Sequence, residues 1–199
     1  MYKDVCLRPA GLSVVGSRGF SLIELLVTLS LVSILLFVAA PSMTDLVADS
    51  RVAETRHRVR ASLALARSEA IRRSTTVTLC ASVDSQSCEG RAKQGKYLWS
   101  QLLLFKDSNA DRMFSTADQD ELIRVVDLSG GGQVLWNRGQ STIYASDGSL
   151  SGSVNGSFYI FDAAEMSKGV RMLLQLTGRL READFSNKDI AYVDQYLGH

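Results

Sequence analysis

The sequence predicts an α+β protein in which one long N-terminal helix covers one face of a β-sheet. Two observations lead to this class. The run from Phe20 to Ala40 is apolar except for Glu24, and apolar residues continue at helical spacing as far as Ala70. After Ser74 the pattern changes to short runs of β-forming residues, separated by turn-rich stretches. A helix followed by a series of strands is typical of an α+β domain.

The composition argues against several classes of protein. The 199 residues carry a formal net charge of +1, which excludes a uniformly basic nucleic-acid-binding protein but leaves room for a local basic patch. The chain has only two histidines, His57 and His199, so a histidine-based catalytic triad or zinc site is hard to assemble. We therefore expect no enzymatic activity, no bound metal and no cofactor.

The apolar run at 20–40 is long enough to cross a membrane. At about 1.5 Å per residue, a helix of this length spans roughly 32 Å, close to the hydrocarbon core of about 30 Å. The alternative is a secretory signal peptide that is cleaved after Ala40. The apolar part of such a peptide usually has about 7 to 15 residues, and Pro41 after the cut would hinder a protease that binds extended backbone. A transmembrane helix is therefore favoured.

Glu24 is the unusual residue of this run, because an unpaired carboxylate in a lipid-embedded helix is costly and is normally retained for a partner. The alternative places it at the headgroup level, solvated and without function. However, the segment from Arg18 to Val27, RGFSLIELLV, closely resembles the processing motif of type IV prepilins. In these proteins a peptidase cuts after the glycine, and the new N-terminal phenylalanine is methylated.

The resemblance implies cleavage between Gly19 and Phe20 by a prepilin peptidase. It also implies that the Glu24 carboxylate pairs with the Phe20 amino group of a neighbouring pilin when the apolar helices stack in a fibre. The expected location is the bacterial inner membrane, with a single span and the head in the periplasm. After assembly with other pilins or pseudopilins, the expected location is the pilus fibre.

The head of the chain resembles the GspH/FimT group of minor pilins and pseudopilins. This implies the type IV pilin fold, a long helix packed on an antiparallel sheet, and covers Arg18 to about Arg181. The segments that carry the resemblance are Leu65–Arg73, Val77–Cys80, Trp99, Phe105–Asp107 and Gly178–Arg179.

The expected organisation has five segments. A leader at 1–19 precedes the membrane and fibre-core helix at 20–40, the periplasmic half of the helix at 41–74, a β-rich head at 75–182 and an acidic tail at 183–199. The arginines between Arg51 and Arg73 are expected to form a solvated face. Seven strands are expected in the head, at Thr75–Ala81, Tyr97–Phe105, Leu122–Val126, Gln133–Trp136, Thr142–Ala145, Ser157–Phe161 and Val170–Leu176.

Two cysteines of the head, Cys80 and Cys88, are close enough in sequence to close a small disulfide in an oxidising periplasm. Free thiols are the alternative. A metal site would need more ligands than these two.

An acidic stretch after the second strand resembles a calcium loop only in part. Asp107, Asn109, Asp111 and Asp118 stand at positions 1, 3, 5 and 12 of an EF-hand count. Position six is Arg112, where the tight turn needs glycine, and no helices flank the stretch. A solvated hairpin turn is favoured over a metal site.

The strongest functional signal lies at the C-terminal end of the last expected strand. There the order Gly178, Arg179, any residue, Arg181 resembles the motif with which FimT-type minor pilins bind DNA during natural transformation. Gly178 permits close approach of the backbone, and the two arginines can grip adjacent phosphates. Lys168 and Arg171 add positive charge to this patch, whereas an acidic tail that folded back would compete with phosphate.

Two functions remain open from the sequence. The first is a minor type IV pilin that is incorporated in the pilus and binds double-stranded DNA without sequence preference, for uptake in natural transformation. The second is a structural minor pilin or type II secretion pseudopilin that primes fibre assembly without binding DNA. Only Arg179 and Arg181 separate the two.

Overall fold

The computed structural model describes residues 19–88, 98–152 and 155–197, without the side chains of residues 38–42. The expected leader therefore lies outside the described residues, except for Gly19. The chain divides into two compact units, Met1–Ser42 and Met43–His199.

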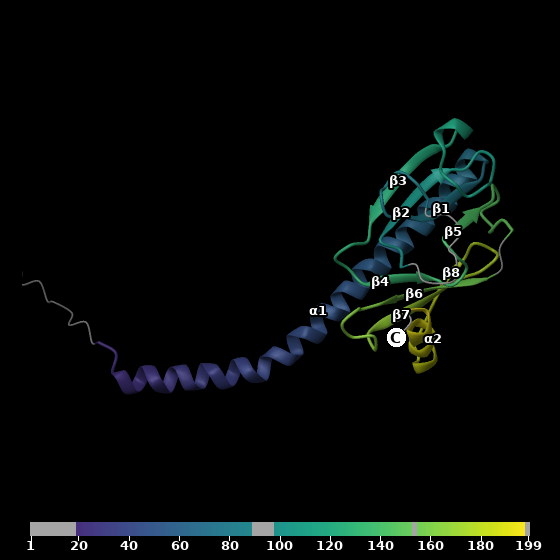
Figure 1. Ribbon diagram of the computed structural model, residues 1–199. Helices are drawn as coiled ribbons and strands as arrows, with labels where there is room; N and C mark the ends of the chain where they lie inside the picture. Colours follow the sequence, from purple (N-terminus) through teal and green to yellow (C-terminus); the bar gives the residue numbers. More distant parts are fainter. Residues whose placement is uncertain (1–18, 89–97, 153–154, 198–199) are drawn as a thin grey trace, which may run out of the picture. The chain divides into compact units, whose positions relative to one another are not determined.

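Helix α1 (Leu22–Arg73) begins in the first unit and ends in the second, so the single long helix is confirmed (Figure 1). From Leu22 to Phe37 its side chains are exposed. The hydroxyls of Thr28, Ser30 and Ser33 donate to carbonyl oxygens three or four residues earlier, so these polar groups are satisfied within the helix. Among the residues that the structure describes, no helix is both long enough and apolar enough to cross a membrane.

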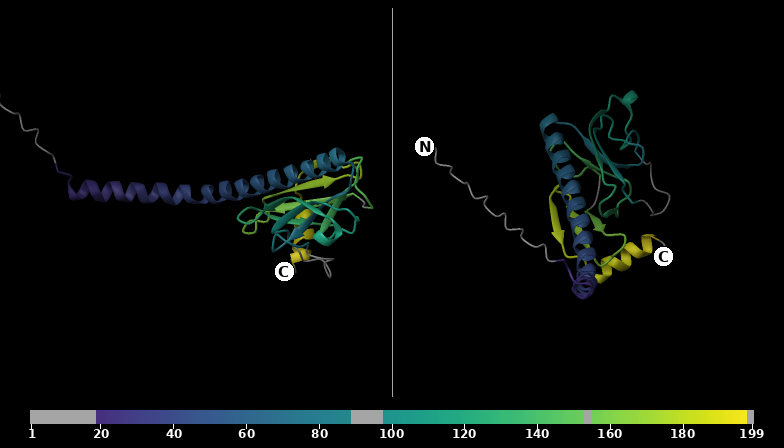
Figure 2. Two further views of the ribbon diagram at one scale, coloured as in Figure 1. Left: turned by 90° about the horizontal axis from the view of Figure 1, so that it is seen from above. Right: turned by 90° about the vertical axis from the view of Figure 1, so that its left-hand side faces the viewer.

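The second unit contains two antiparallel four-stranded sheets, where the sequence predicts one sheet (Figures 1 and 2). Sheet A has the strand order β3-β2-β1-β5, and sheet B has the order β4-β6-β7-β8. The strands of sheet A are β1 (Val77–Ser82), β2 (Gln101–Lys106), β3 (Glu121–Asp127) and β5 (Ser141–Tyr144). The strands of sheet B are β4 (Gln133–Trp136), β6 (Gly156–Phe161), β7 (Gly169–Leu174) and β8 (Leu180–Ala183). A short 3-10 turn, η1 (Thr116–Asp118), precedes β3.

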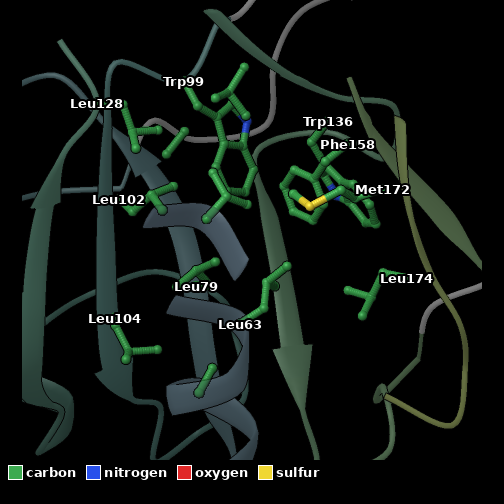
Figure 3. Close-up of a cluster of buried hydrophobic side chains, with 14 of the residues drawn as sticks. Leu63, Leu79, Trp99, Leu102, Leu104, Leu128, Trp136, Phe158, Met172 and Leu174 are labelled. Atoms are coloured by element: carbon green, nitrogen blue, oxygen red, sulfur yellow. The ribbon is translucent and has the colours of Figure 1, made fainter. Parts of the chain in front are cut away.

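The main hydrophobic core joins both sheets to one face of α1. The buried helix residues recur at helical spacing, which is why a single face can serve both sheets. In Figure 3, Leu63 of α1 lies between Leu79 of sheet A and Leu174 of sheet B. Trp99 meets Phe158 edge-on, with ring centroids 5.4 Å apart. The core residues that α1 contributes are Val52, Val59, Leu63, Ala66 and Ala70.

No helix was expected in the segment predicted as an acidic tail, but the structure contains one. Residues 183–197 complete β8 and form helix α2 (Asn187–Leu197), which lies on the side of sheet B away from α1 (Figure 2). The helix buries Val193 against Tyr159 of β6. Asp189 caps its start by accepting hydrogen bonds from the backbone N–H and the hydroxyl of Ser186. The helix therefore forms despite its negative charge, because it has an apolar face and a cap.

Among the described residues, the three clusters of buried apolar side chains lie within 43–199. The second unit therefore has a core of its own.

Candidate nucleic-acid interface

The predicted DNA motif lies on a hairpin rather than at the end of a strand. Strand β7 ends at Leu174, the chain turns, and β8 begins at Leu180. The turn is closed by the N–H of Gln175, which donates to the carbonyl of Arg179 over 2.9 Å, and by the N–H of Gly178, which donates to the carbonyl of Gln175 over 2.8 Å. Arg179 thus belongs to the turn, and Arg181 to the edge strand of sheet B.

Gly178 has a structural role that differs from the expected one. Its φ of +71° lies in the left-handed region that favours glycine. A Cβ at this position would lie 2.0 Å from the carbonyl oxygen of Gly148 and 3.1 Å from the ring of Tyr144. The residue is buried against the loop that follows β5. The close approach that Gly178 permits is therefore made by the protein's own backbone.

Arg179 and Arg181 are both exposed. Within the described residues, neither side chain has a hydrogen-bond or ion-pair partner. The neighbouring Glu182 does not neutralise Arg181, because alternation along β8 places the two side chains on opposite faces of the sheet. The carboxylate of Glu182 pairs with two arginines of α1, at 3.6 Å from Arg56 and 2.6 Å from Arg60.

The other two cations of the predicted patch are neutralised. The Nζ of Lys168 lies 3.5 Å from the carboxylate of Asp49, and a guanidinium nitrogen of Arg171 lies 2.8 Å from that of Asp189. Burial raises the pKa of Asp189, but hydrogen bonds from Ser186 and the charge of Arg171 outweigh it, so its pKa lies below the ordinary value. Asp189 is therefore ionised at neutral pH. Among the described residues of the C-terminal segment, Asp189 is thus the acidic partner of one cation of the predicted patch, Arg171.

Most arginines of α1 are also engaged. Glu69 binds both Arg72 and Arg73, and the hydrogen bond from Arg72 is the largest of the causes that lower the pKa of Glu69 to about 2. Arg67 is the exception among the seven, because no described residue accepts a hydrogen bond from its buried Nε. The remaining pairs are Arg51 with Asp162, Arg56 and Arg60 with Glu182, Arg58 with Glu54, and Arg73 with Glu121. The helix thus does not present an open face of seven free cations.

Cys80 and Cys88 form the predicted disulfide, with an S–S distance of 2.09 Å and Cα atoms 5.7 Å apart. Both residues are buried with Leu103 and Phe105 on one face of sheet A.

The acidic stretch after β2 is a hydrogen-bonded turn. One carboxylate oxygen of the buried Asp107 accepts the hydroxyl of Thr78 at 2.7 Å and the N–H of Arg112 at 3.0 Å. Burial is the main cause that raises the pKa of Asp107. Asp120 accepts the backbone N–H groups of Ser108 and Ser115. Across the described part of the chain, no group of three or more His, Cys, Asp or Glu side chains is placed to hold a metal ion.

The residues of the predicted processing site lie at the start of the described chain. Gly19 and Phe20 precede α1, and Glu24 lies in the first helical turn. All three are exposed. No atom lies within 4 Å of the position that a Cβ on Gly19 would occupy.

Comparison with known proteins identifies the family. The model of the family described as "Type II transport protein GspH" matches residues 55–178, and that of the "Prokaryotic N-terminal methylation motif" matches residues 16–40. No curated protein matches the chain by sequence. The GspH match ends at Gly178, so Arg179 and Arg181 lie immediately beyond it.

Solved structures share the fold at low sequence identity. A crystal structure of the type IV minor pilin FimU of Pseudomonas aeruginosa matches with a TM-score of 0.51 and 15% identity, over 68% of this chain and 90% of that one. A second crystal form of FimU gives a TM-score of 0.47 at 18% identity, over 68% and 91% of the two chains. The minor pseudopilin EpsH from the type 2 secretion system of Vibrio cholerae gives 0.40 at 17% identity, over 67% and 93%. At such identities the FimU likeness shows the fold alone, whereas the GspH model matches more than half of this chain. With its pilin fold and its N-terminal methylation motif, the protein therefore belongs to the GspH family.

Proposed function

We propose that this protein is a minor pilin that binds DNA through the β7–β8 hairpin. The supporting observation is which cations of the predicted patch have acidic partners. Of the four cations in the predicted patch, Arg179 and Arg181 are exposed and have no acidic partner among the described residues, whereas Lys168 and Arg171 each have one. Two free guanidinium groups on one hairpin can each bind a phosphate oxygen with charge-assisted hydrogen bonds.

Binding of this kind is weak and independent of sequence. Contacts to phosphate position a protein on DNA but do not distinguish bases. The hairpin carries no helix that could read base pairs in the major groove, and its two free arginines can contact only a few phosphates. Affinity is expected to fall with salt, with a log-log slope of about −0.9 for each phosphate neutralised. Several heads on one pilus would raise the effective concentration of sites.

The N-terminal motif supports a second part of the proposal. A prepilin peptidase cuts between Gly19 and Phe20, and the mature chain is held in the inner membrane by residues 20–40 with its head in the periplasm. The chain then enters a fibre with other pilins. There, the Glu24 carboxylate pairs with the Phe20 amino group of a neighbour, and either charge left alone would be costly in a low-dielectric fibre core.

A purely structural role is the second candidate, and the match to the family described as a type II transport protein favours it. In that role the protein is a pseudopilin or minor pilin that primes fibre assembly, and the two arginines of the hairpin are merely solvated.

Fluorescence-anisotropy titration of a labelled DNA duplex with the full chain in neutral detergent separates the two candidates. Changing both Arg179 and Arg181 to Gln is expected to abolish most binding at low salt and to leave the melting temperature unchanged, because both side chains are exposed.

The matched control is the double change of Arg58 and Arg72 to Gln, which removes the same charge from arginines that are already paired. This variant is expected to bind almost as the wild type does. If the hairpin variant binds as well as the wild type, the DNA-binding proposal is wrong. If no protein binds at low salt, the structural role takes its place.

A further inference from the structure

A groove of about 330 Å³ lies between α1 and the β7–β8 hairpin. Gly178 forms part of its wall, so the groove reaches the hairpin that carries the two unpaired arginines. On the helix side it is lined by Ala64 and Arg67, and on the sheet side by Tyr144 and Leu180. Apolar side chains thus surround a cationic group.

Arg67 is the cation without a partner in this groove. Its Nε is buried, and no described residue accepts a hydrogen bond from it. Buried polar groups in folded proteins nearly always have a hydrogen-bond partner in the protein or in ordered water. Among the described residues, the whole guanidinium of Arg67 has neither a hydrogen-bond nor an ion-pair partner, so its charge is available to an acceptor from outside the chain. An anion is the acceptor that suits this group, because guanidinium binds carboxylate and phosphate most strongly.

The charges around Arg67 leave it available. Arg60 also lines the groove, but its guanidinium pairs with Glu182 at 2.6 Å. Asp147 lies within electrostatic range, since Arg67 is among the causes that lower its pKa, after the hydrogen bonds from Ser149. Asp147 makes no ion pair with Arg67 among the described contacts, and its Oδ1 accepts both the N–H and the hydroxyl of Ser149. One positive charge therefore remains free in the groove.

The groove has both apolar and cationic walls, and this combination indicates which class of anion it suits. A DNA strand presents apolar deoxyribose groups between its phosphates, whereas an inorganic ion presents no apolar surface. The aliphatic side chains of Leu63, Ile71 and Leu180 line the groove together with Arg67. Sugar against these side chains and phosphate against the guanidinium would satisfy both kinds of surface.

We propose that Arg67 binds a backbone phosphate of the same DNA molecule that Arg179 and Arg181 hold. The DNA-binding surface would then pass from Arg181, on the face of sheet B away from α1, around the turn that carries Arg179 and into the groove along α1. This inference rests on the proposed function. It adds one phosphate contact from a helix that lies more than a hundred residues earlier in the chain.

Two variants test the groove in different ways, in the full chain in neutral detergent and with the labelled duplex as probe. Arg67→Gln removes the charge. Ala64→Trp fills the groove from an exposed helix position and leaves every charge in place. Each is expected to weaken binding on the order of tenfold at low salt and to reduce the salt slope by about 0.9, the value for one phosphate. Arg67→Lys is expected to retain most of the slope.

Arg72→Gln is the matched control, because it removes one charge from the same helix at a residue already paired with Glu69. If Arg67→Gln and Ala64→Trp both bind like this control, while the hairpin variant has lost binding, the groove inference is wrong and the proposed function stands. If the hairpin variant binds as the wild type does, the proposed function fails, whatever the groove variants do.

Thermal unfolding by circular dichroism accompanies each titration. If Arg67→Gln does not fold, Arg67→Lys and Ala64→Trp still decide the question. Poly-glutamate is titrated as a second probe. If it binds in a groove-dependent way while DNA binding is unaffected by both groove variants, the groove belongs to an acidic protein segment, which overturns the proposal.

Discussion

Replacing Gly178 by Ala tests whether this glycine serves the fold or the DNA. The change has two costs for stability. An L-residue in the left-handed region at φ +71° loses about 1–2 kcal/mol. The new Cβ would also lie 2.0 Å from the carbonyl oxygen of Gly148. Because the neighbour is backbone, the loop must move, and overpacking of this kind costs about 1–3 kcal/mol.

Gly130→Ala is the matched control for this variant. Gly130 has a similar φ of +79°, but nothing lies within 4 Å of the position of its Cβ. This variant is therefore expected to lose only the conformational cost of about 1–2 kcal/mol. The clash at Gly178 is the difference between the two variants, about 1–3 kcal/mol. One kcal/mol shifts the melting temperature of a domain of 150–250 residues by about 2–4 °C, so Gly178→Ala should melt roughly 2–12 °C below the control.

The assay is urea and thermal unfolding of residues 43–199, the unit that holds the core, followed by titration with labelled duplex DNA. The fragment must begin before Ala48, because this residue is already buried and a fragment that began after it would lack part of the packed helix. If Gly178→Ala is as stable as Gly130→Ala but has lost its affinity for DNA, the glycine serves the approach of DNA and the structural reasoning is refuted.

Further predictions concern the N-terminus, the disulfide and the C-terminal helix. Gly19→Trp should leave the leader attached, because a cleavage pocket adapted to glycine has no room for the ring; an intact mass that still corresponds to a start at Phe20 would contradict this. Fresh, non-reduced protein should bind no alkylating reagent at Cys80 or Cys88, and reduction should lower the free energy of unfolding by at most about 2–3 kcal/mol; labelling of both thiols would refute the bond. Because the pKa of Asp189 is held low, its carboxylate stabilises the fold above the ordinary carboxyl pKa of about 3.9, and this stability is lost as the pH falls through the lowered pKa. Asp189→Asn should therefore be less stable than the wild type at pH 7 by about 1–3 kcal/mol, with a difference that shrinks toward pH 2; a difference independent of pH in urea unfolding would count against this reasoning.

Features that depend on residues close together in the chain could be predicted from the sequence alone. The spacing of apolar residues predicts the long helix, because one helical face must be apolar to pack. Strand β4 has the predicted bounds, Gln133–Trp136, since its run of β-forming residues ends at turn residues on both sides. The N-terminal motif is likewise local. The start of α2, where Asp189 accepts hydrogen bonds from Ser186, also depends on residues only three apart, but this helix was not predicted.

The three-dimensional arrangement was needed to show which of the predicted site residues have no acidic partner. Lys168 and Arg171 look like Arg179 and Arg181 in the sequence, but the first two have acidic partners. The partner of Lys168 is Asp49, 119 residues away, and Arg60 binds Glu182 over 122 residues. Coulomb interactions depend on distance in space, and no local pattern records which charges the fold brings within a few ångströms. The same holds for Gly178. The backbone that comes close to this glycine is the protein's own, because the nearby carbonyl oxygen belongs to a loop thirty residues earlier.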